Sequence, residues 1–355
     1  MTEPQQPPVG VLVVDDSAVN RRSISEALTS TPEVKIVGKA ANGEEALRLA
    51  LLLKPDVITL DLEMPRMDGF TFLRILMSRQ PTPVIVVSSY SQKENVFKAL
   101  ELGALDFVAK PDRQTDAELA SIRRELVAKV LQTRSLRPKS LASRPRIDSV
   151  SGMHVAPIVR QKRTEPPRRV VAVASSTGGP TALIQIFARI PDGYDSALLV
   201  AQHMPERFTR TFAQRLDRRA RILVSEALER DAVTAGMALI CPGRRCMELG
   251  SDGDELAVRV VDPDASDRYV PSADRLFSSV AKAVGPRAVG VILTGMGDDG
   301  VLGARDILDA GGTVIAESEE TAVVYGMPGA AVRAGVVSRS LPIHRIADFV
   351  AGLGG

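Results

Sequence analysis

Short apolar runs alternate with segments whose apolar residues recur at helical spacing, and this alternation occurs in two blocks along the chain. In the first block the apolar runs lie at residues 9–14, 34–37, 57–60, 83–87 and 104–109, and helical segments such as 18–28 and 44–53 lie between them. Strands that alternate with helices are typical of a parallel sheet covered by helices. The block therefore predicts a doubly wound α/β domain with a parallel sheet.

The second block begins at residue 170 and repeats this alternation. Strands are expected at residues 170–174, 197–201, 222–224, 238–241, 255–260, 288–293 and 312–316, and helices at 180–188, 208–216, 273–284, 301–310 and 343–353. This pattern predicts a second doubly wound parallel sheet, of the Rossmann-like kind.

A segment rich in Ser, Pro and Arg separates the two blocks and predicts a flexible linker. Its residues from 134 to 169 include ten basic and two acidic side chains, a net charge of +8, whereas the whole chain carries only +2. The basic excess thus belongs to one segment rather than to a folded face, so we expect no nucleic-acid partner. The predicted domains are residues 9–132 and 170–355, with the linker at 133–169.

Composition argues against several other classes of protein. Two cysteines, Cys241 and Cys246, are too few for a disulfide framework or a four-ligand zinc site, so we expect a reducing, cytoplasmic compartment. The N-terminal residues do not resemble a signal peptide, and no apolar run approaches the roughly 20 residues of a membrane span, so we expect no membrane insertion. With no Trp and 4% aromatic residues, stacking platforms for single-stranded nucleic acid are not expected.

Polar side chains follow four of the five expected strands of the first block. Asp15 and Asp16 end the first strand, Asp61 ends the third, Ser88 the fourth and Lys110 the fifth. Ligands of open parallel sheets bind beyond the carboxyl ends of the strands. Clustered carboxylates favour a hard cation such as Mg²⁺, and a lysine beside them can neutralise phosphoryl oxygens. This pattern predicts a phosphoryl-transfer site with Asp61 as its nucleophile.

The first block resembles the response-regulator receiver domain over its whole length, and this resemblance implies a flavodoxin-like fold. The resemblance rests on Val13-Val14-Asp15-Asp16-Ser17, Leu60-Asp61-Leu62-Glu63-Met64-Pro65-Arg66-Met67-Asp68-Gly69, Val87-Ser88-Ser89 and Asp106-Phe107-Val108-Ala109-Lys110-Pro111. It implies that Asp61 accepts a phosphoryl group from a histidine kinase. It also implies that Asp15, Asp16, Asp61 and the backbone carbonyl of Glu63 hold Mg²⁺, and that Ser88, Phe107 and Lys110 respond to the phosphoryl group.

Three polar segments follow strands of the second block. Val173-Ala174-Ser175-Ser176-Thr177-Gly178-Gly179-Pro180 runs from a strand into a helix, His203 follows the strand at 197–201, and Asp298 and Asp299 follow the strand at 288–293. A glycine-rich strand-to-helix turn exposes a serine and directs backbone N–H groups at the atom it attacks. Serine, histidine and carboxylate form an activated-serine arrangement. The pattern leaves open Ser175 or Ser176, and Asp298 or Asp299.

Residues 170–355 resemble the catalytic domain of the CheB family of chemotaxis protein-glutamate methylesterases. In that family the nucleophile precedes Thr-Gly-Gly, the histidine lies in Gln-His-Met-Pro, and the aspartate precedes the last glycine of Gly-Met-Gly-x-Asp-Gly. The resemblance therefore implies Ser176, His203 and Asp299 as catalytic residues, with Thr177, Gly178 and Met296 supporting the oxyanion site. Cys246 stands where the family commonly has a histidine, and we expect it to be a buried filler.

The resemblance implies a phosphorylation-activated esterase that needs Mg²⁺ at the receiver site and no cofactor for ester hydrolysis. Its substrates would be methylated glutamates of chemoreceptors and, by the same chemistry, receptor glutamines, and a CheA-type histidine kinase would be its phosphodonor. An alternative is a paralogue that acts on receptors of a non-motility signalling array. A receiver-linked transcription factor and a general small-molecule esterase are further alternatives.

Overall fold

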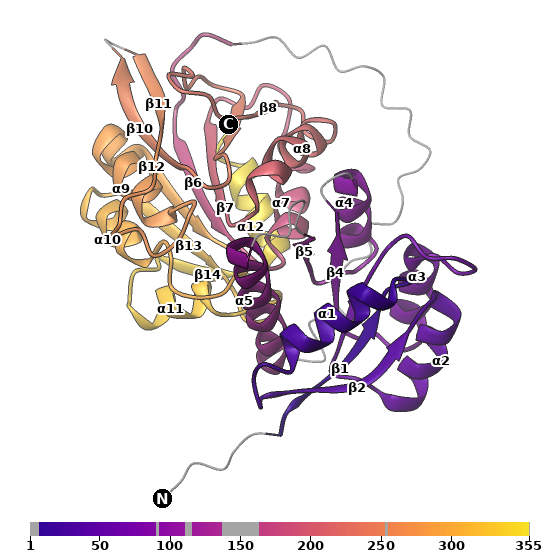
Figure 1. The fold of residues 1–355 in the computed structure, drawn as a ribbon. Helices are drawn as coiled ribbons and strands as arrows, with labels where there is room; N and C mark the ends of the chain where they lie inside the picture. Colours follow the sequence, from indigo (N-terminus) through magenta and orange to yellow (C-terminus); the bar gives the residue numbers. More distant parts are fainter. Residues whose placement is uncertain (1–6, 90–91, 111–115, 137–162, 253–254, 355) are drawn as a thin grey trace, which may run out of the picture. The chain divides into compact units, whose positions relative to one another are not determined.

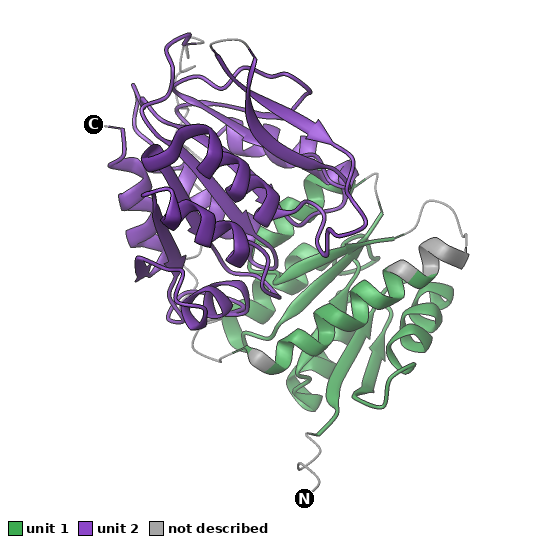
Figure 2. Cartoon of the chain, turned by 90° about the vertical axis from the view of Figure 1, so that its left-hand side faces the viewer, with its two compact units in different colours: residues 1–150 green, residues 151–355 purple. Residues whose placement is uncertain are grey.

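The computed structural model describes residues 7–89, 92–110, 116–136, 163–252 and 255–354. The chain divides into two compact units, residues 1–150 and 151–355 (Figure 2). Most of the predicted linker, including His154, lies outside the described residues. The C-terminal end of this segment, from residue 163, is bonded to the rest of the second unit. Arg163 donates to the carbonyl of Gly193 over 3.0 Å, and the Ala235 N–H donates to the carbonyl of Glu165 over 2.9 Å. The domain limits stay a prediction.

Unit 1 contains a five-stranded parallel sheet in the order β2-β1-β3-β4-β5 (Figure 1). The strands are β1 (Val9–Val14), β2 (Val34–Ala40), β3 (Val57–Leu60), β4 (Val84–Ser88) and β5 (Asp106–Ala109). This is the flavodoxin-like order, so the predicted fold class of the first block is confirmed. The sheet places the carboxyl ends of β1 and β3 side by side.

The helices of unit 1 are α1 (Ala18–Leu28), α2 (Gly43–Leu53), α3 (Gly69–Arg79), α4 (Lys93–Glu101) and α5 (Asp116–Gln132), followed by the short 3₁₀ helix η2 (Thr133–Ser135). The first three begin behind Ser17, Asn42 and Asp68, whose side chains each accept an N–H of the first turn. Such caps satisfy donors that a helix end leaves free, and each contributes about 1 kcal/mol. Helix α1 packs beside α5, and α2 beside α3.

Unit 2 contains a seven-stranded parallel sheet in the order β14-β13-β12-β6-β7-β9-β8. The strands are β6 (Val170–Ser175), β7 (Ala197–Gln202), β8 (Leu223–Glu226), β9 (Met237–Ile240), β12 (Ala288–Ile292), β13 (Thr313–Glu317) and β14 (Arg339–Leu341). From β6 the chain first builds one side of the sheet and then returns to build the other from β12. The neighbours β6 and β12 therefore form the topological switch point, where open α/β sheets bind ligands.

Helices surround this sheet: α7 (Gly179–Phe187), α8 (Glu206–Asp217), α9 (Ala273–Val284), α10 (Val301–Asp309), α11 (Met327–Arg333), α12 (Ile343–Ala351) and the 3₁₀ helix η3 (Gly285–Arg287). Of these, α9 packs on α10, and α7 on α12 and α8. The strand and helix pattern thus confirms the second predicted α/β fold. The sequence analysis did not predict α11 or the edge strand β14, which span only seven and three residues.

The strand expected at residues 255–260 forms, but it does not join the parallel sheet. It is β11 (Glu255–Val261), which pairs antiparallel with β10 (Cys246–Asp252). Only two residues separate these strands, and so short a connection permits a hairpin but not a parallel crossover. The prediction that this segment belongs to the main sheet was therefore wrong, and β10 was missed.

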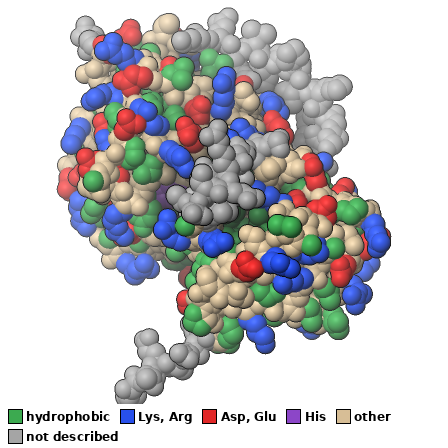
Figure 3. All heavy atoms as spheres, in the orientation of Figure 1, with side chains coloured by type: hydrophobic (Ala, Val, Ile, Leu, Met, Phe, Trp, Pro, Cys, Tyr) green, Lys and Arg blue, Asp and Glu red, His purple; other side chains and the backbone are tan. Residues whose placement is uncertain are grey.

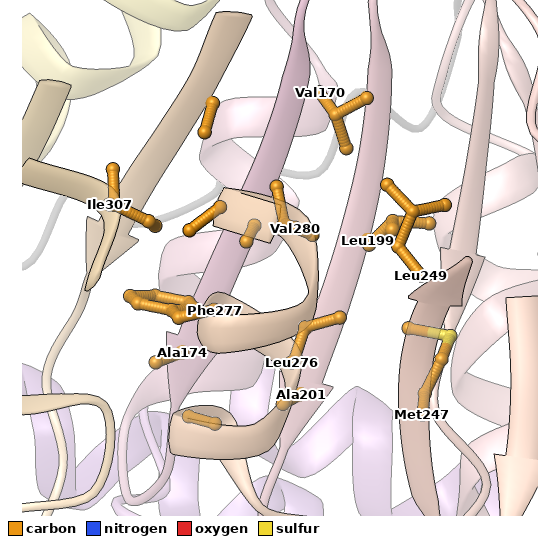
Figure 4. Close-up of a cluster of buried hydrophobic side chains, with 14 of the residues drawn as sticks. Val170, Ala174, Leu199, Ala201, Met247, Leu249, Leu276, Phe277, Val280 and Ile307 are labelled. Carbon is orange, nitrogen blue, oxygen red and sulfur yellow. The ribbon is translucent and has the colours of Figure 1, made fainter. Parts of the chain in front are cut away.

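One hydrophobic cluster of the core of unit 2 lies between its sheet and α9 (Figure 4). Leu276, Phe277 and Val280 are fully buried on α9, against residues such as Ala174 of β6 and Leu199 of β7. Each large apolar side chain buried here contributes roughly 1.5–3 kcal/mol. The burial fixes the position of the N-terminus of α9 at the carboxyl edge of the sheet.

The surface carries charges of both signs. On the face drawn in Figure 3, acidic and basic side chains are intermixed over the described residues of each unit. Of the helices that the structure describes, none combines the length and the apolar composition needed to cross a bilayer.

Close packing of α9 against α10 predicts a cost for any side chain at Gly303. A Cβ there would lie 2.5 Å from the Asp274 carbonyl oxygen and 2.5 Å from the Phe277 Cβ, so one helix would have to move. We expect Gly303→Ala to lower the free energy of unfolding by about 1–3 kcal/mol in urea titrations followed by circular dichroism. The control is Gly250→Ala, where the nearest atom would be 4.0 Å away. Equal stability of the two variants would contradict this packing account.

Candidate active site and phosphoryl-acceptor site

The predicted acidic cluster of unit 1 forms where β1 and β3 end. Asp15 and Asp61 are buried, Asp16 is exposed, and one carboxylate oxygen from each lies within 4.8 Å of the others. Asp15 is held by the Ser17 N–H, which donates to its Oδ1 over 2.8 Å. The strand ends therefore gather three carboxylates at one point.

Lys110 joins two of these carboxylates. Its Nζ lies 2.9 Å from Asp15 Oδ2 and 2.7 Å from Asp61 Oδ2. Burial raises the pKa of the Asp61 carboxyl, and the Asp15 charge adds to this effect, while the hydrogen bond from Lys110 opposes it. Burial alone would lower the pKa of Lys110, but the two carboxylates raise it. The lysine is therefore held as a cation beside the predicted phosphoryl acceptor.

The donor set of this cluster fits Mg²⁺. All three side chains offer carboxylate oxygens, which are the ligands that a hard divalent cation prefers. The fourth predicted ligand, the carbonyl of Glu63, belongs to an adjacent residue whose N–H lies 3.4 Å from Asp61 Oδ1. Its contribution to metal binding stays a prediction.

The predicted switch residues lie on β4 and β5. Ser88 is buried, and its hydroxyl donates to Gln92 Oε1 over 2.7 Å. The buried Phe107 ring packs edge-on against Phe97, with ring centroids 6.3 Å apart. Lys129 of α5 donates to the Phe107 carbonyl over 2.7 Å. Phe107 is thus tied to both α4 and α5, two elements that a phosphoryl-dependent change in its position would affect.

In unit 2, three adjacent strands deliver the predicted catalytic residues. Ser176 directly follows β6, His203 directly follows β7, and Asp299 lies in the loop after β12. Backbone hydrogen bonds lock these ends together: the His203 N–H donates to the Ser175 carbonyl over 2.9 Å, and the Ser176 N–H to the Thr294 carbonyl over 3.1 Å. The three residues therefore lie together at the switch point of the sheet.

The two neighbouring serines differ in their surroundings. Ser175 is fully buried, and its hydroxyl donates to Gln202 Oε1 over 2.7 Å. Ser176 is half-buried, at the start of the turn that leads into α7. No hydrogen bond joins its hydroxyl to His203 within the described part of the chain, and such contacts in free enzymes commonly tighten only with substrate. Ser176 is therefore the serine open to a substrate.

The imidazole of His203 is oriented by Asp299. His203 Nε2 lies 2.8 Å from Asp299 Oδ2, and the imidazole is mostly shielded from water. Since Nε2 is engaged by the carboxylate, Nδ1 is the nitrogen available to take a proton from Ser176. The ring is thus oriented in the reverse sense to the Ser-His-Asp template, in which the carboxylate faces Nδ1.

Asp299 is itself fixed by the N-terminus of α9. Its side chain is 1% exposed and accepts the N–H groups of Ala273 over 2.8 Å and Asp274 over 3.0 Å. The positive end of the helix dipole adds to these two bonds. A buried carboxylate is costly unless its oxygens are hydrogen-bonded in this way. The neighbouring Asp298 instead accepts from Tyr269 and Arg268 at the surface.

The predicted oxyanion residues Thr177, Gly178 and Met296 lie on two loops that touch. Gly178 has a positive φ of 80° and adjoins the first residue of α7, and a Cβ there would lie 2.9 Å from Val323. A Cβ on Gly295 would lie 2.7 Å from the Ser176 Cβ. Glycine at position 295 therefore lets the Met296 segment approach the serine, and glycine at 178 lets the turn approach Val323. Met296 itself is 45% exposed.

Two buried polar residues of this site were missed by the sequence analysis. Gln202 donates through Nε2 to the carbonyls of Ser176 over 3.0 Å and His203 over 2.9 Å. The Thr294 hydroxyl donates to the Thr177 carbonyl over 2.9 Å and accepts from the Val324 N–H over 2.9 Å. Gln202 ends β7 and Thr294 lies two residues after β12, and this position at a strand end was the one available signal. Both tie together the loops that carry the predicted catalytic side chains.

The Cys246 thiol lies near the backbone of Ser272, the N-cap residue of α9. It is buried at the start of β10, and its sulfur lies 3.8 Å from Asp267 Oδ2. Burial raises the pKa of its thiol, and the Asp267 charge adds to this effect. These surroundings favour the thiol over the reactive thiolate.

The contacts of the two adjacent aspartates predict unequal effects of substitution. In Asp299→Asn only one side-chain oxygen remains to accept from two helix N–H groups and the imidazole. The His203 tautomer that the carboxylate favours is therefore lost. We expect kcat for ester hydrolysis to fall roughly 10³- to 10⁴-fold. The matched variant Asp298→Asn should lose less than tenfold. Equal losses would contradict the assignment of Asp299.

Asp274 predicts a pH dependence of stability. Burial, with repulsion from Asp299, raises its pKa from 3.8 to about 6, although the Gly303 N–H donates to it over 2.9 Å. The folded chain therefore binds this proton more tightly than the unfolded chain. The resulting stability is fully present below pH 3.8 and is lost as the pH rises through 6.

We expect Asp274→Asn to remove this decline in the free energy of unfolding, which is on the order of 1–2 kcal/mol after screening by water. The variant should therefore be more stable than the wild type at pH 7. The amide oxygen still accepts from Gly303. Urea titrations between pH 4 and pH 7 measure the effect, with Asp252→Asn at an exposed position as the control. If the free energy of unfolding of Asp274→Asn fell as much as that of the wild type between pH 4 and pH 7, Asp274 would not be its source.

Comparison with known families gives two matches that together cover most of the chain. The family model described as CheB methylesterase matches residues 171–350, and the response regulator receiver domain matches residues 11–120. The crystal structure of the Thermotoga maritima CheB methylesterase catalytic domain is similar with a TM-score of 0.51 and 34% identity, over 52% of this chain and 98% of that one.

Full-length relatives are also similar. A protein-glutamate methylesterase/protein-glutamine glutaminase of Myxococcus xanthus is 48% identical over 97% of both chains. Relatives of the same name from Geobacter sulfurreducens and Bacillus subtilis are 46% and 41% identical, over 95% and 97% of both chains respectively. With both family matches and this coverage, the chain belongs to the CheB family of methylesterases that carry a response-regulator receiver domain.

Proposed function

We propose that this chain is a phosphorylation-activated serine esterase that demethylates glutamate methyl esters on chemoreceptors and deamidates receptor glutamines. The observation that carries the proposal is the meeting of Ser176, His203 and Asp299 at three adjacent strand ends, with the last two joined by a 2.8 Å hydrogen bond. The names of the full-length relatives support both activities.

The first half of the reaction forms an acyl-enzyme. Ser176 Oγ attacks the γ-carbonyl carbon of the methylated glutamate, and His203 takes the hydroxyl proton at Nδ1. Asp299 stabilises the imidazolium through Nε2. His203 then returns the proton to the methoxy oxygen, the carbon–oxygen bond breaks, and methanol leaves.

The second half regenerates the serine. Water, deprotonated by His203, attacks the acyl carbon, and the Ser176 oxygen leaves with the proton from the imidazolium. The product is a glutamate side chain. Glutamine follows the same course with ammonia as its leaving group, so both substrates give the same acyl-enzyme.

Backbone donors on two loops are suited to the oxyanion. We assign this role to the Thr177–Gly178 turn, next to the N-terminus of α7, and to the Met296 segment held close to Ser176 by Gly295. Fixed N–H groups and a helix N-terminus stabilise charge that develops in the transition state without reorganising.

The receiver unit supplies the regulation. Asp61 accepts a phosphoryl group from a CheA-type histidine kinase, and the Lys110 ammonium neutralises part of its charge. Asp15, Asp16, Asp61 and the Glu63 carbonyl would hold Mg²⁺, which would neutralise phosphoryl oxygens during the transfer. The Ser88 hydroxyl then exchanges Gln92 for a phosphoryl oxygen.

A cytoplasmic location stays a prediction from the sequence, since kinase and receptor glutamates would meet the enzyme there.

The paralogue that serves a non-motility array is not favoured by the comparisons. The esterase needs no metal of its own in this mechanism, because the proposed nucleophile, base and oxyanion donors all come from the chain.

Methanol release from methylated receptor membranes tests the function. We expect the intact chain to release methanol, and a small-molecule phosphodonor with Mg²⁺ to raise the rate about tenfold or more. Ser176→Ala should lose at least about 10³-fold of the activity, whereas Ser175→Ala should keep a measurable rate. Asp61→Asn should not respond to the phosphodonor.

Three results would overturn the proposal. Full activity of Ser176→Ala would exclude the serine mechanism. Hydrolysis of simple esters without any release from receptors would instead indicate a small-molecule esterase, and binding to DNA with no hydrolysis would indicate a transcription factor.

A further inference from the structure

The imidazole of His203 lies flat against the ring of Tyr269. The ring centroids are 5.4 Å apart and the planes differ by 7°, which is an offset stack. Tyr269 lies between β11 and α9 and is half-buried. It therefore covers one face of the imidazole, whereas the contact with Asp299 is made at the edge.

The hydroxyl of Tyr269 reaches the loop that carries Asp299. It donates to Asp298 Oδ1 over 2.9 Å, and Arg268 lies 3.2 Å from the other oxygen of the same carboxylate. It also lies against Gly297, where a Cβ would be only 2.3 Å from the Tyr269 oxygen. Burial and the bond to Asp298 raise the pKa of Tyr269, so the hydroxyl stays a donor. One side chain thus contacts both the histidine and the loop from Gly295 to Asp299.

We propose that Tyr269 is a positioning residue for the esterase reaction: its ring fixes the plane of the His203 imidazole, and its hydroxyl fixes the Gly297–Asp298 turn. The inference rests on the proposed function, because it assigns the residue to that reaction. It also gives Asp298 a role distinct from that of Asp299, as the acceptor of the Tyr269 hydroxyl.

The single bond to Asp299 cannot orient the imidazole alone. A hydrogen bond at Nε2 fixes one ring atom, but the ring can still rotate about the axis that runs from Cγ to Nε2. Nδ1 would then move away from the Ser176 hydroxyl, whose proton it has to take. A flat aromatic surface removes this motion, and its electron-rich face also favours the charge that the imidazole gains on taking the proton.

Two substitutions in the full chain separate the ring from the hydroxyl. Tyr269→Leu removes the stack and the donor, whereas Tyr269→Phe removes only the donor. We expect Tyr269→Leu to lower kcat for methanol release by roughly three- to tenfold with KM unchanged, and Tyr269→Phe to recover most of that loss. Circular dichroism melting of both variants verifies that they fold.

Nuclear magnetic resonance of the imidazoles provides a measurement that does not depend on turnover. The chain has three histidines, so labelling with ¹³C at Cε1 alone gives three ring signals, and His203→Gln identifies the one from His203. A stacked aromatic ring shifts the protons above it upfield. We expect this shift in the wild type and in Tyr269→Phe, and its loss in Tyr269→Leu.

Three outcomes would overturn the proposal: a Tyr269→Leu enzyme with unchanged kcat, equal losses in the Leu and Phe variants, or a rise in KM alone, which would indicate substrate contact. A wild-type chain that releases no methanol would overturn the proposed function instead. The ring shift would still decide whether Tyr269 holds the imidazole, so the two failures are distinguishable.

Discussion

The catalytic unit depends on one buried carboxylate, that of Asp299. A carboxylate with 1% exposure is costly unless it is fully bonded, and here two N–H groups of α9 and the imidazole of His203 satisfy it. The helix can hold it because α9 is anchored by Leu276, Phe277 and Val280 in the core. Apolar packing on one side of the sheet thus determines where the imidazole points on its carboxyl edge. The same arrangement places Asp274 beside a second negative charge, which raises its pKa and costs stability at neutral pH.

The loops around this carboxylate are held by close backbone approach rather than by large side chains. Gly295 lies against Ser176, and Gly297 against Tyr269, so a Cβ at either position would collide with a catalytic or positioning residue. The hydroxyl of Thr294 and the amide of Gln202 bridge carbonyls of different loops. These buried bonds hold the three strand ends in one fixed arrangement, as electrostatic stabilisation of a transition state requires.

Much of this could be predicted from the sequence because parallel strands deliver their carboxyl ends to one edge. That rule alone placed Asp15, Asp61 and Lys110 together, and it placed a serine, His203 and an aspartate together. Periodicity could not separate Ser175 from Ser176, since adjacent residues at a strand end differ only in which one enters the turn. Tyr269 carried no such signal, because its loop follows the hairpin strand β11 rather than a strand of the main sheet, and its contact with His203 is made across the fold. The hairpin itself was misassigned because an apolar run does not reveal its partner strand.

The most direct test of this account is the ¹⁵N chemical shifts of the His203 ring at neutral pH, in the full chain. The account predicts that Nε2 carries the proton and faces Asp299, while Nδ1 shows the shift of an unprotonated nitrogen that can accept from Ser176. In Asp299→Asn this preference should weaken or reverse. A wild-type imidazole with its proton on Nδ1 would contradict the account, because neither the carboxylate nor the serine would then have the partner assigned to it.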